Sequence, residues 1–226
     1  MTMLGQGAVA IWHDIAAEGR DDFYAWHGQE HMPERVGIEG FNRGRRFIAI
    51  DADRAYFNLY ETRDADVVKG DAYKARLENP TPWTIATVKH FRAVARSLCR
   101  VAWSTGAADG GLVATARYTV PVEEAVAHEE RMAGMFLPGL MELPGIAAAH
   151  LLAADLEASG FVNAEQRARG TANEVPSHAL VVEGWADEAD FIDTLRGAIT
   201  RILPARSGPA TAPGVGFYRL QLTTWK

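Results

Sequence analysis

Residues 31–41 read HMPERVGIEGF, and residues 136–146 read FLPGLMELPGI. Each stretch has a proline at its third position and a glycine at its tenth. Both landmarks therefore recur at one spacing, since 138 − 33 = 105 and 145 − 40 = 105. Because order and spacing agree, we predict that the second half of the chain is a diverged copy of the first.

The same offset places residues 9–11 on residues 114–116, so that one β-favouring run falls on another. Farther along the chain the offset grows, because Asp64 corresponds to Asp187 and 187 − 64 = 123. The additional residues fall in the polar, glycine-containing stretch 156–177. We expect this stretch to be an inserted loop.

Hydrophobic and β-branched runs predict strands, and helical spacing with caps predicts helices. Thr81 and Pro82 are a helix cap and a first-turn proline, and the apolar spacing after them predicts a helix to Leu98. The predicted strands are 7–14, 41–50, 55–62, 99–104, 112–120, 146–153, 179–185 and 215–225. The predicted helices are 23–37, 64–77, 82–98, 121–142 and 187–203.

This order predicts an α+β fold of two tandem ferredoxin-like βαββαβ units. We place them at residues 1–106 and 107–226, across the linker GAADGG. Helices cover only one face of each sheet, so the other faces must be buried. We therefore expect the antiparallel sheets to pack face to face as an α+β barrel, with a ligand cavity between them.

Composition excludes several functional classes. The net charge of −6 argues against nucleic acid or an anionic membrane as a partner, since both require clustered Lys and Arg. No apolar run is long enough to span a membrane and no signal peptide is visible, so we expect a cytoplasmic protein. The single cysteine, Cys99, allows no intramolecular disulfide and is expected to be buried and inert.

Candidate catalytic residues gather on the first helix. His27, Glu30, His31 and Glu34 are spaced three or four apart and share a helix face. His27-Gly28-Gln29-Glu30-His31 also fits H-x-x-E-H, a zinc-peptidase motif. Three interpretations stay open: a zinc site, a solvated polar face, or His31 as an acid/base group oriented by Glu30 or Glu34.

Other candidates come from strand alternation, which sends every second side chain inward. Trp12 and His13 point to opposite faces of the first strand, so only one of them can face a cavity. Aromatic rings can stack on a planar ligand, and an inward arginine needs an anionic partner. The predicted substrate-binding residues are Trp12, His13, Trp26, Tyr60, Tyr118 and Arg219.

The pattern Phe23-x-x-Trp26-x-x-x-x-His31-x-Pro33, followed by Gly40-Phe41, resembles the EthD-like branch of the dimeric α+β barrel superfamily. The resemblance covers the first half; in the second half Phe136 replaces His31. It implies a barrel with a cavity, and activities that range over cofactor-free monooxygenases, lactone isomerases, dehydratases and decarboxylase-like cyclases. Haem-binding relatives use a related tandem arrangement.

We expect a small-molecule enzyme without a bound cofactor, of the isomerase, lyase or cofactor-free oxygenase kind. Its substrate would be a cyclic or aromatic carbonyl compound. One alternative is a metal- or haem-dependent enzyme that uses the His27-Glu30-His31 patch, or His90 or His150 as an iron ligand. Another is a non-catalytic small-molecule binding protein. Both a monomer and a homodimer stay open.

Overall fold

The computed structural model of the chain describes residues 3–203 and 213–226. Its strands are β1 (Gly7–Ile15), β2 (Phe41–Ala52), β3 (Tyr56–Thr62), β4 (Phe91–Gly106), β5 (Leu112–Tyr118), β6 (Ile146–Ala154), β7 (His178–Gly184) and β8 (Gly214–Trp225). They close into a barrel in the order β1-β3-β2-β8-β5-β7-β6-β4, with every neighbouring pair antiparallel. The predicted α+β barrel is confirmed.

The barrel consists of two four-stranded sheets with the same internal order. Strands β4-β1-β3-β2 form one sheet, and β8-β5-β7-β6 repeat that arrangement strand for strand. Pairing of β2 with β8 and of β4 with β6 joins the sheets, which leaves no open edge. We refer below to these sheets and their helices as the first and second units.

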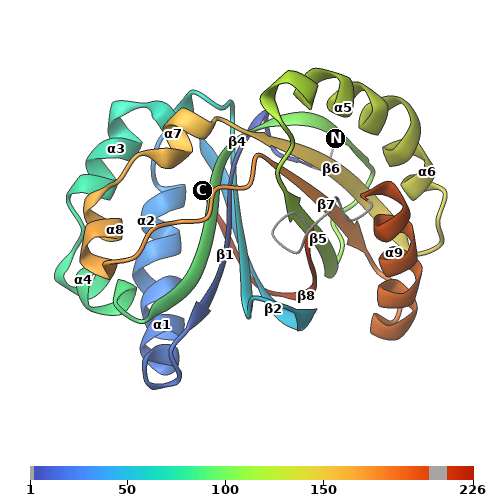
Figure 1. Cartoon of the computed structure of the whole chain (residues 1–226). Helices are drawn as coiled ribbons and strands as arrows, with labels where there is room; N and C mark the ends of the chain where they lie inside the picture. Colours follow the sequence, from blue (N-terminus) through green and yellow to red (C-terminus); the bar gives the residue numbers. More distant parts are fainter. Residues whose placement is uncertain (1–2, 204–212) are drawn as a thin grey trace.

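Helices cover the outside of the barrel on two sides (Figure 1). The first unit carries η1 (Ala17–Gly19), α1 (Arg20–Trp26), η2 (His27–His31), α2 (Met32–Val36), η3 (Val67–Lys69), α3 (Asp71–Glu78) and α4 (Pro82–Val88). The second carries η4 (Val122–Glu124), α5 (Ala125–Arg131), η5 (Met132–Phe136), α6 (Leu137–Met141), α7 (Leu156–Gly160), α8 (Ala164–Arg169) and α9 (Glu188–Ile202). Among the described residues, no helix is long and apolar enough to cross a membrane.

The stretch predicted as an inserted loop contains α7 and α8. These short helices belong to the second half of the chain, yet they pack beside α3, α4 and β4 of the first unit (Figure 1). Asp155 caps α7 by accepting the Ala158 N–H at 3.0 Å, and Asn163 caps α8 by accepting the Gln166 N–H at 2.9 Å. Residues 156–177 therefore cover the side of the first unit that α3, α4 and β4 form.

The two units also repeat an irregularity. Residues His27–His31 and Met132–Phe136 both form a π-helical turn between two α-helical segments. The turns begin 105 residues apart (132 − 27 = 105), the offset of the sequence repeat. Sequence periodicity predicted continuous helices here, because one wider turn leaves the surrounding apolar spacing nearly unchanged.

The glycines of the opening motif have a conformational reason. Gly40 and Gly145 adopt φ values of +89° and +80°, where side chains are disfavoured. A Cβ on Gly40 would lie 2.5 Å from Cγ2 of Val67, and one on Gly145 would lie 2.6 Å from Cβ of Ala186. Each turn leads from a helix into an end strand of its four-stranded sheet, Gly40 into β2 and Gly145 into β6.

One secondary-structure prediction is wrong. The helix expected to reach Leu98 ends at Val88, and β4 begins at Phe91. Its beginning is confirmed, since Thr81 Oγ1 accepts the Thr84 N–H at 3.0 Å. Beyond Val88, pairing with β1 along one side, and backbone hydrogen bonds of Val94 and Arg96 to Glu174 on the other, outweigh the helical spacing.

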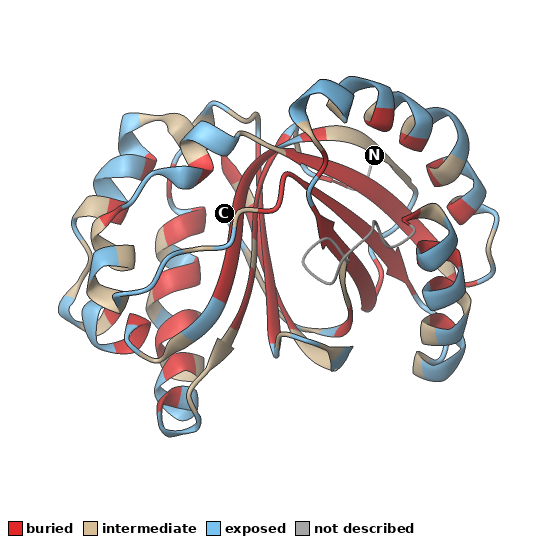
Figure 2. Cartoon of the chain, in the orientation of Figure 1, coloured by how far each residue is buried: buried red, intermediate tan, exposed pale blue. Residues whose placement is uncertain are grey.

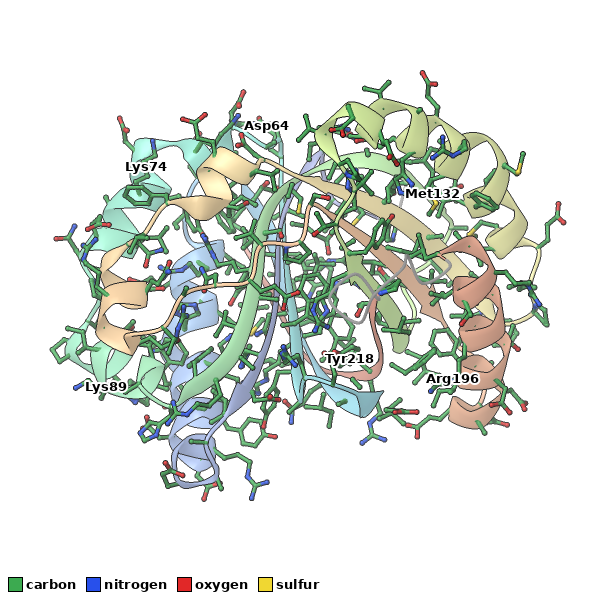
Figure 3. The ribbon with its side chains drawn as sticks, in the orientation of Figure 1. Asp64, Lys74, Lys89, Met132, Arg196 and Tyr218 are labelled. Carbon is green, nitrogen blue, oxygen red and sulfur yellow. The ribbon has the colours of Figure 1, made fainter. Side chains whose placement is uncertain are left out.

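Most residues of the barrel strands are buried (Figure 2), and apolar side chains from the inner faces of both sheets pack into one cluster. Trp12 stacks on Phe57 with ring centroids 4.9 Å apart, and Phe47 and Tyr218 complete an aromatic layer. Tyr218 lies among many inward-pointing side chains in Figure 3. The structure therefore differs from the predicted cavity between the sheets: the pockets described below lie outside the barrel.

A buried ion cluster occupies the rest of the interior. Arg45 donates to both oxygens of Glu183, at 2.8 and 2.9 Å, and lies 3.0 Å from Glu61 Oε1. Arg43 donates to both oxygens of Glu61 at 2.9 Å, and His150 Nε2 lies 3.4 Å from Glu183. Burial alone would raise the pKa of Glu183, but the hydrogen bond from His150 and the charge of Arg45 hold it well below its ordinary value.

We predict that Glu183→Gln lowers the free energy of unfolding by about 3–5 kcal/mol, because it leaves a buried guanidinium undercompensated. The matched control is Glu188→Gln, which removes the partner of Arg219 in an exposed ion pair and should change stability by less than about 1 kcal/mol. Urea unfolding at neutral pH measures both. Equal small losses would show that the interior cluster contributes no more than a surface pair.

Candidate functional site

A pocket lies on the outer face of the first sheet, beneath the first-unit helices. Its volume is about 70 Å³. A second space of about 600 Å³, between α3 and α7, shares Leu77 and Arg96 with it. We name these the inner pocket and the outer chamber. The inner pocket is lined by Ile11, Trp26, His31, Arg35, Phe41, Tyr60, Tyr73, Leu77, Val88, Phe91, Val94, Arg96, Glu165 and Arg169.

His31 ends the π-helical turn and lines the inner pocket. Its residue is 8% exposed, and the ring centroid lies 4.3 Å from that of Trp26. Within the described chain, its buried Nδ1 atom has no hydrogen-bond partner. Burial, together with the neighbouring positive charge of Arg35, holds the pKa of His31 well below its ordinary 6.5. The imidazole is therefore neutral at neutral pH.

His27 is fixed by protein groups on both ring nitrogens. Arg46 lies 3.3 Å from Nδ1, and the Tyr60 hydroxyl lies 3.3 Å from Nε2. Because a guanidinium only donates, Nδ1 accepts and Nε2 carries the proton. The rings of His27 and His31 are stacked with centroids 5.5 Å apart. In the described ranges, no three His, Cys, Asp or Glu side chains are close enough to hold one metal ion.

The two glutamates of the helix contact other partners than His31. Glu30 accepts hydrogen bonds from the hydroxyls of Thr81 at 2.6 Å and Thr84 at 3.3 Å, which ties η2 to the start of α4. Glu34 pairs with Arg35 at 3.3 Å and Arg76 at 3.1 Å. The contacts of Trp26 with His31, rather than a carboxylate, therefore set the orientation of that ring.

The first-strand candidates are separated by the sheet. Trp12 points into the barrel, where its Nε1 donates to Thr115 Oγ1 at 3.0 Å. His13 lies on the helix side, 4.4 Å from the Phe91 ring and 2.9 Å from the Asn58 amide. Burial lowers the pKa of His13 to about 3. His13 packs behind the inner pocket, whose lining does not include it.

Two candidates lie far from the inner pocket. Arg219 is on the surface and pairs with Glu188 at 2.9 Å. Tyr118 lies in the second unit, at the edge of a pocket of about 310 Å³. Its hydroxyl is 2.8 Å from His128 Nε2, and its ring stacks on His178. The structure thus brings together His31, Trp26 and Tyr60, with Glu30, Glu34 and His13 next to them.

Sequence analysis missed a group of polar residues in the inner pocket: Arg35, Tyr73, Arg96, Glu165 and Arg169. Arg35 forms a buried ion pair with Glu165 of α8. Burial lowers the pKa of Arg35, but the charge of Glu165 outweighs that effect and the pKa is raised. The polar composition of residues 156–177 indicated a loop. It gave no indication that this segment packs on the first unit.

No family model and no curated protein matches this chain. Several solved structures are similar to it. An anthrone oxidase-like protein is 11% identical with a TM-score of 0.62, over 97% of this chain and 92% of that one. A candidate monooxygenase from Lactobacillus acidophilus is 12% identical with a TM-score of 0.55, over 97% and 96%. Another from Fusobacterium nucleatum is 10% identical with a TM-score of 0.55, over 99% and 96%.

At these identities the similarity shows the fold alone. This chain shares the α+β barrel of all three proteins over nearly its whole length. The resemblance of the first half to the EthD-like branch stays a prediction.

We predict that the wild-type free energy of unfolding decreases as the pH falls from 6.5 toward 5. The folded-state pKa values of His13, His27 and His31 lie below that of an unfolded histidine. The unfolded chain therefore binds more protons in this window, and stability is lost on acidification. Each histidine contributes at most about 1.4 kcal/mol per pH unit.

His31→Gln should reduce this slope by up to about 1.4 kcal/mol per pH unit, because glutamine does not titrate. Urea unfolding at pH 5.0, 5.5, 6.0 and 6.5 measures it. An identical slope in the variant would mean that His31 is not held neutral in the folded protein.

Proposed function

We propose that this protein is a small-molecule enzyme whose site is the inner pocket, with His31 as its acid/base group. The substrate is a cyclic or aromatic carbonyl compound. The observation that carries the proposal is the buried, neutral imidazole in the pocket wall, whose Nδ1 atom lacks a partner among the described residues. Buried polar atoms are normally hydrogen-bonded, and unsatisfied ones concentrate where ligands bind or react.

The proposed step is a proton transfer. A C–H bond next to the substrate carbonyl breaks, its proton moves to the His31 imidazole, and the electron pair moves to the carbonyl oxygen as an enolate. A neutral imidazole can accept this proton throughout the neutral pH range. The cationic side chains of the pocket, among them Arg35, stabilise the enolate charge.

Neighbouring residues position the reacting groups. Burial raises the pKa of Tyr60, so its hydroxyl stays protonated and can donate a hydrogen bond. Trp26 fixes the His31 ring and is itself anchored, because its Nε1 donates to Thr84 Oγ1 at 3.1 Å. Glu30 bonds the same threonine, which connects this anchor to the π-helical turn. Glu30 is thus proposed as a positioning residue rather than as the partner of His31.

The proposal covers the isomerase, lyase and cofactor-free oxygenase alternatives, since each can begin with this proton transfer. The oxidase-like and monooxygenase names of the structural neighbours are in keeping with the last of these. A cofactor-free mechanism, a cytoplasmic location, homodimer formation and the division into units at residue 106 all stay proposals.

The test measures exchange of the proton that the proposed step removes. Protein is incubated in deuterated water with a panel of cyclic and aromatic ketones, and NMR measures deuterium incorporation next to the carbonyl. We predict that wild-type protein accelerates exchange for a subset of the panel and that His31→Gln lowers that rate by about 10²–10⁴-fold. His90→Gln, which replaces a histidine outside the inner pocket, should exchange like wild type.

Exchange that persists undiminished in a folded His31→Gln variant would remove His31 from the mechanism. Tight binding of panel compounds without any exchange would instead identify a non-catalytic binding protein.

A further inference from the structure

Arg96 is a buried cation without a carboxylate partner. Its residue is 8% exposed, and its Nη2 donates to the Tyr73 hydroxyl at 2.9 Å. Among the described residues, its Nε and Nη1 groups have no hydrogen-bond partner and Arg96 forms no ion pair. These two groups are not fully enclosed, and Arg96 lines both the inner pocket and the outer chamber. Because an arginine inside a protein normally pairs with an anion, these donors are available to an anionic ligand.

The other buried arginines show how this fold ordinarily satisfies such a charge. Four of them pair with a carboxylate: Arg35 with Glu165, Arg43 with Glu61, Arg45 with Glu183 and Arg117 with Asp53. A fifth, Arg46, lies over the rings of Phe23 and Tyr24 and donates to Gln221. Arg96 has neither arrangement.

A second cation stands beside it. Arg169 of α8 also lines the inner pocket, and its hydrogen bonds go to Thr171 and Asn173 rather than to an acid. Burial, together with the positive charge of Arg96, lowers the pKa of Arg169. The acidic group of the inner pocket, Glu165, is held by Arg35. The pocket therefore has an excess of positive charge.

We propose that the ligand carries a carboxylate, which binds Arg96 at the junction of the inner pocket and the outer chamber. This inference rests on the proposed function, since it assigns the substrate class of the same site. A carboxylate matches the remaining donors of the guanidinium, which can bind it through two parallel hydrogen bonds.

The volumes of the two spaces orient such a ligand. The inner pocket, at about 70 Å³, is far smaller than the outer chamber and fits only the reactive end of a molecule. The outer chamber, at about 600 Å³, has room for a ring, against Val68, Leu98 and Phe161. Lys74 of α3, labelled in Figure 3, is an exposed residue of its lining. The class is an aromatic or cyclic oxo acid.

The experiment compares 2-naphthoate with its neutral analogue 2-naphthamide by calorimetric titration of the full chain. We expect wild-type protein to bind 2-naphthoate at least about tenfold more tightly than the amide. Arg96→Met should weaken 2-naphthoate about 10- to 100-fold and change 2-naphthamide by less than about threefold. Arg96→Lys, which keeps the charge but not the planar fork, should lie between.

The matched control is Arg100→Gln, on the same strand but half-exposed and paired with Glu129, which should bind both probes like wild type. Equal wild-type affinity for the two probes, no binding of 2-naphthoate, or unchanged binding in Arg96→Met would each overturn the carboxylate site. Carboxylate-dependent binding combined with His31-independent proton exchange would keep this site while removing the proposed function.

Discussion

The two units of this chain are joined by strand pairing at two seams, β2 with β8 and β4 with β6, and by a buried charge cluster that spans the barrel interior. Arg45 lies between Glu61 of the first unit and Glu183 of the second, and the backbone N–H of Gly110, in the linker between β4 and β5, also donates to Glu183 at 3.0 Å. Arg45 is 1% exposed and its partners are fully buried, so the cluster is stable only when both sheets are in register. With the aromatic layer around Trp12, it fills the interior. We therefore propose that the ligand site lies outside the barrel, between the first sheet and its helices, where the inner pocket is found.

Much of the fold was predictable from residue patterns. The repeat of proline and glycine at one offset predicted two units, and the barrel confirms that order of elements. The helix prediction failed after Val88, where backbone pairing with β1 and with Glu174 determines the conformation of β4. The π-helical turn of His27–His31 was not predictable, because one wider turn barely alters the hydrophobic periodicity.

The site was predictable only in part. His31, Trp26 and Tyr60 were selected by type and spacing, and they share the inner pocket. Arg96, Arg169 and Glu165 come together only because α7 and α8 cross to the first unit, a tertiary contact that no local pattern encodes. In the second unit Phe136 takes the place of His31, and two histidines of that unit, His128 and His178, surround Tyr118 instead. One unit thus carries the proposed chemistry, and the other completes its barrel and one wall of its pocket.

The central claim is that a ligand binds against His31 in the first unit. Long-range ¹H–¹⁵N NMR of the imidazoles, recorded while phenylpyruvate is added, tests this most directly. The histidines of the second unit serve as an internal control in the same spectra. The account predicts that the ring signals of His31 shift on titration, while those of His128 and His178, beside the second-unit pocket, stay in place. Shifts confined to His128 and His178, or no shift at His31, would contradict it.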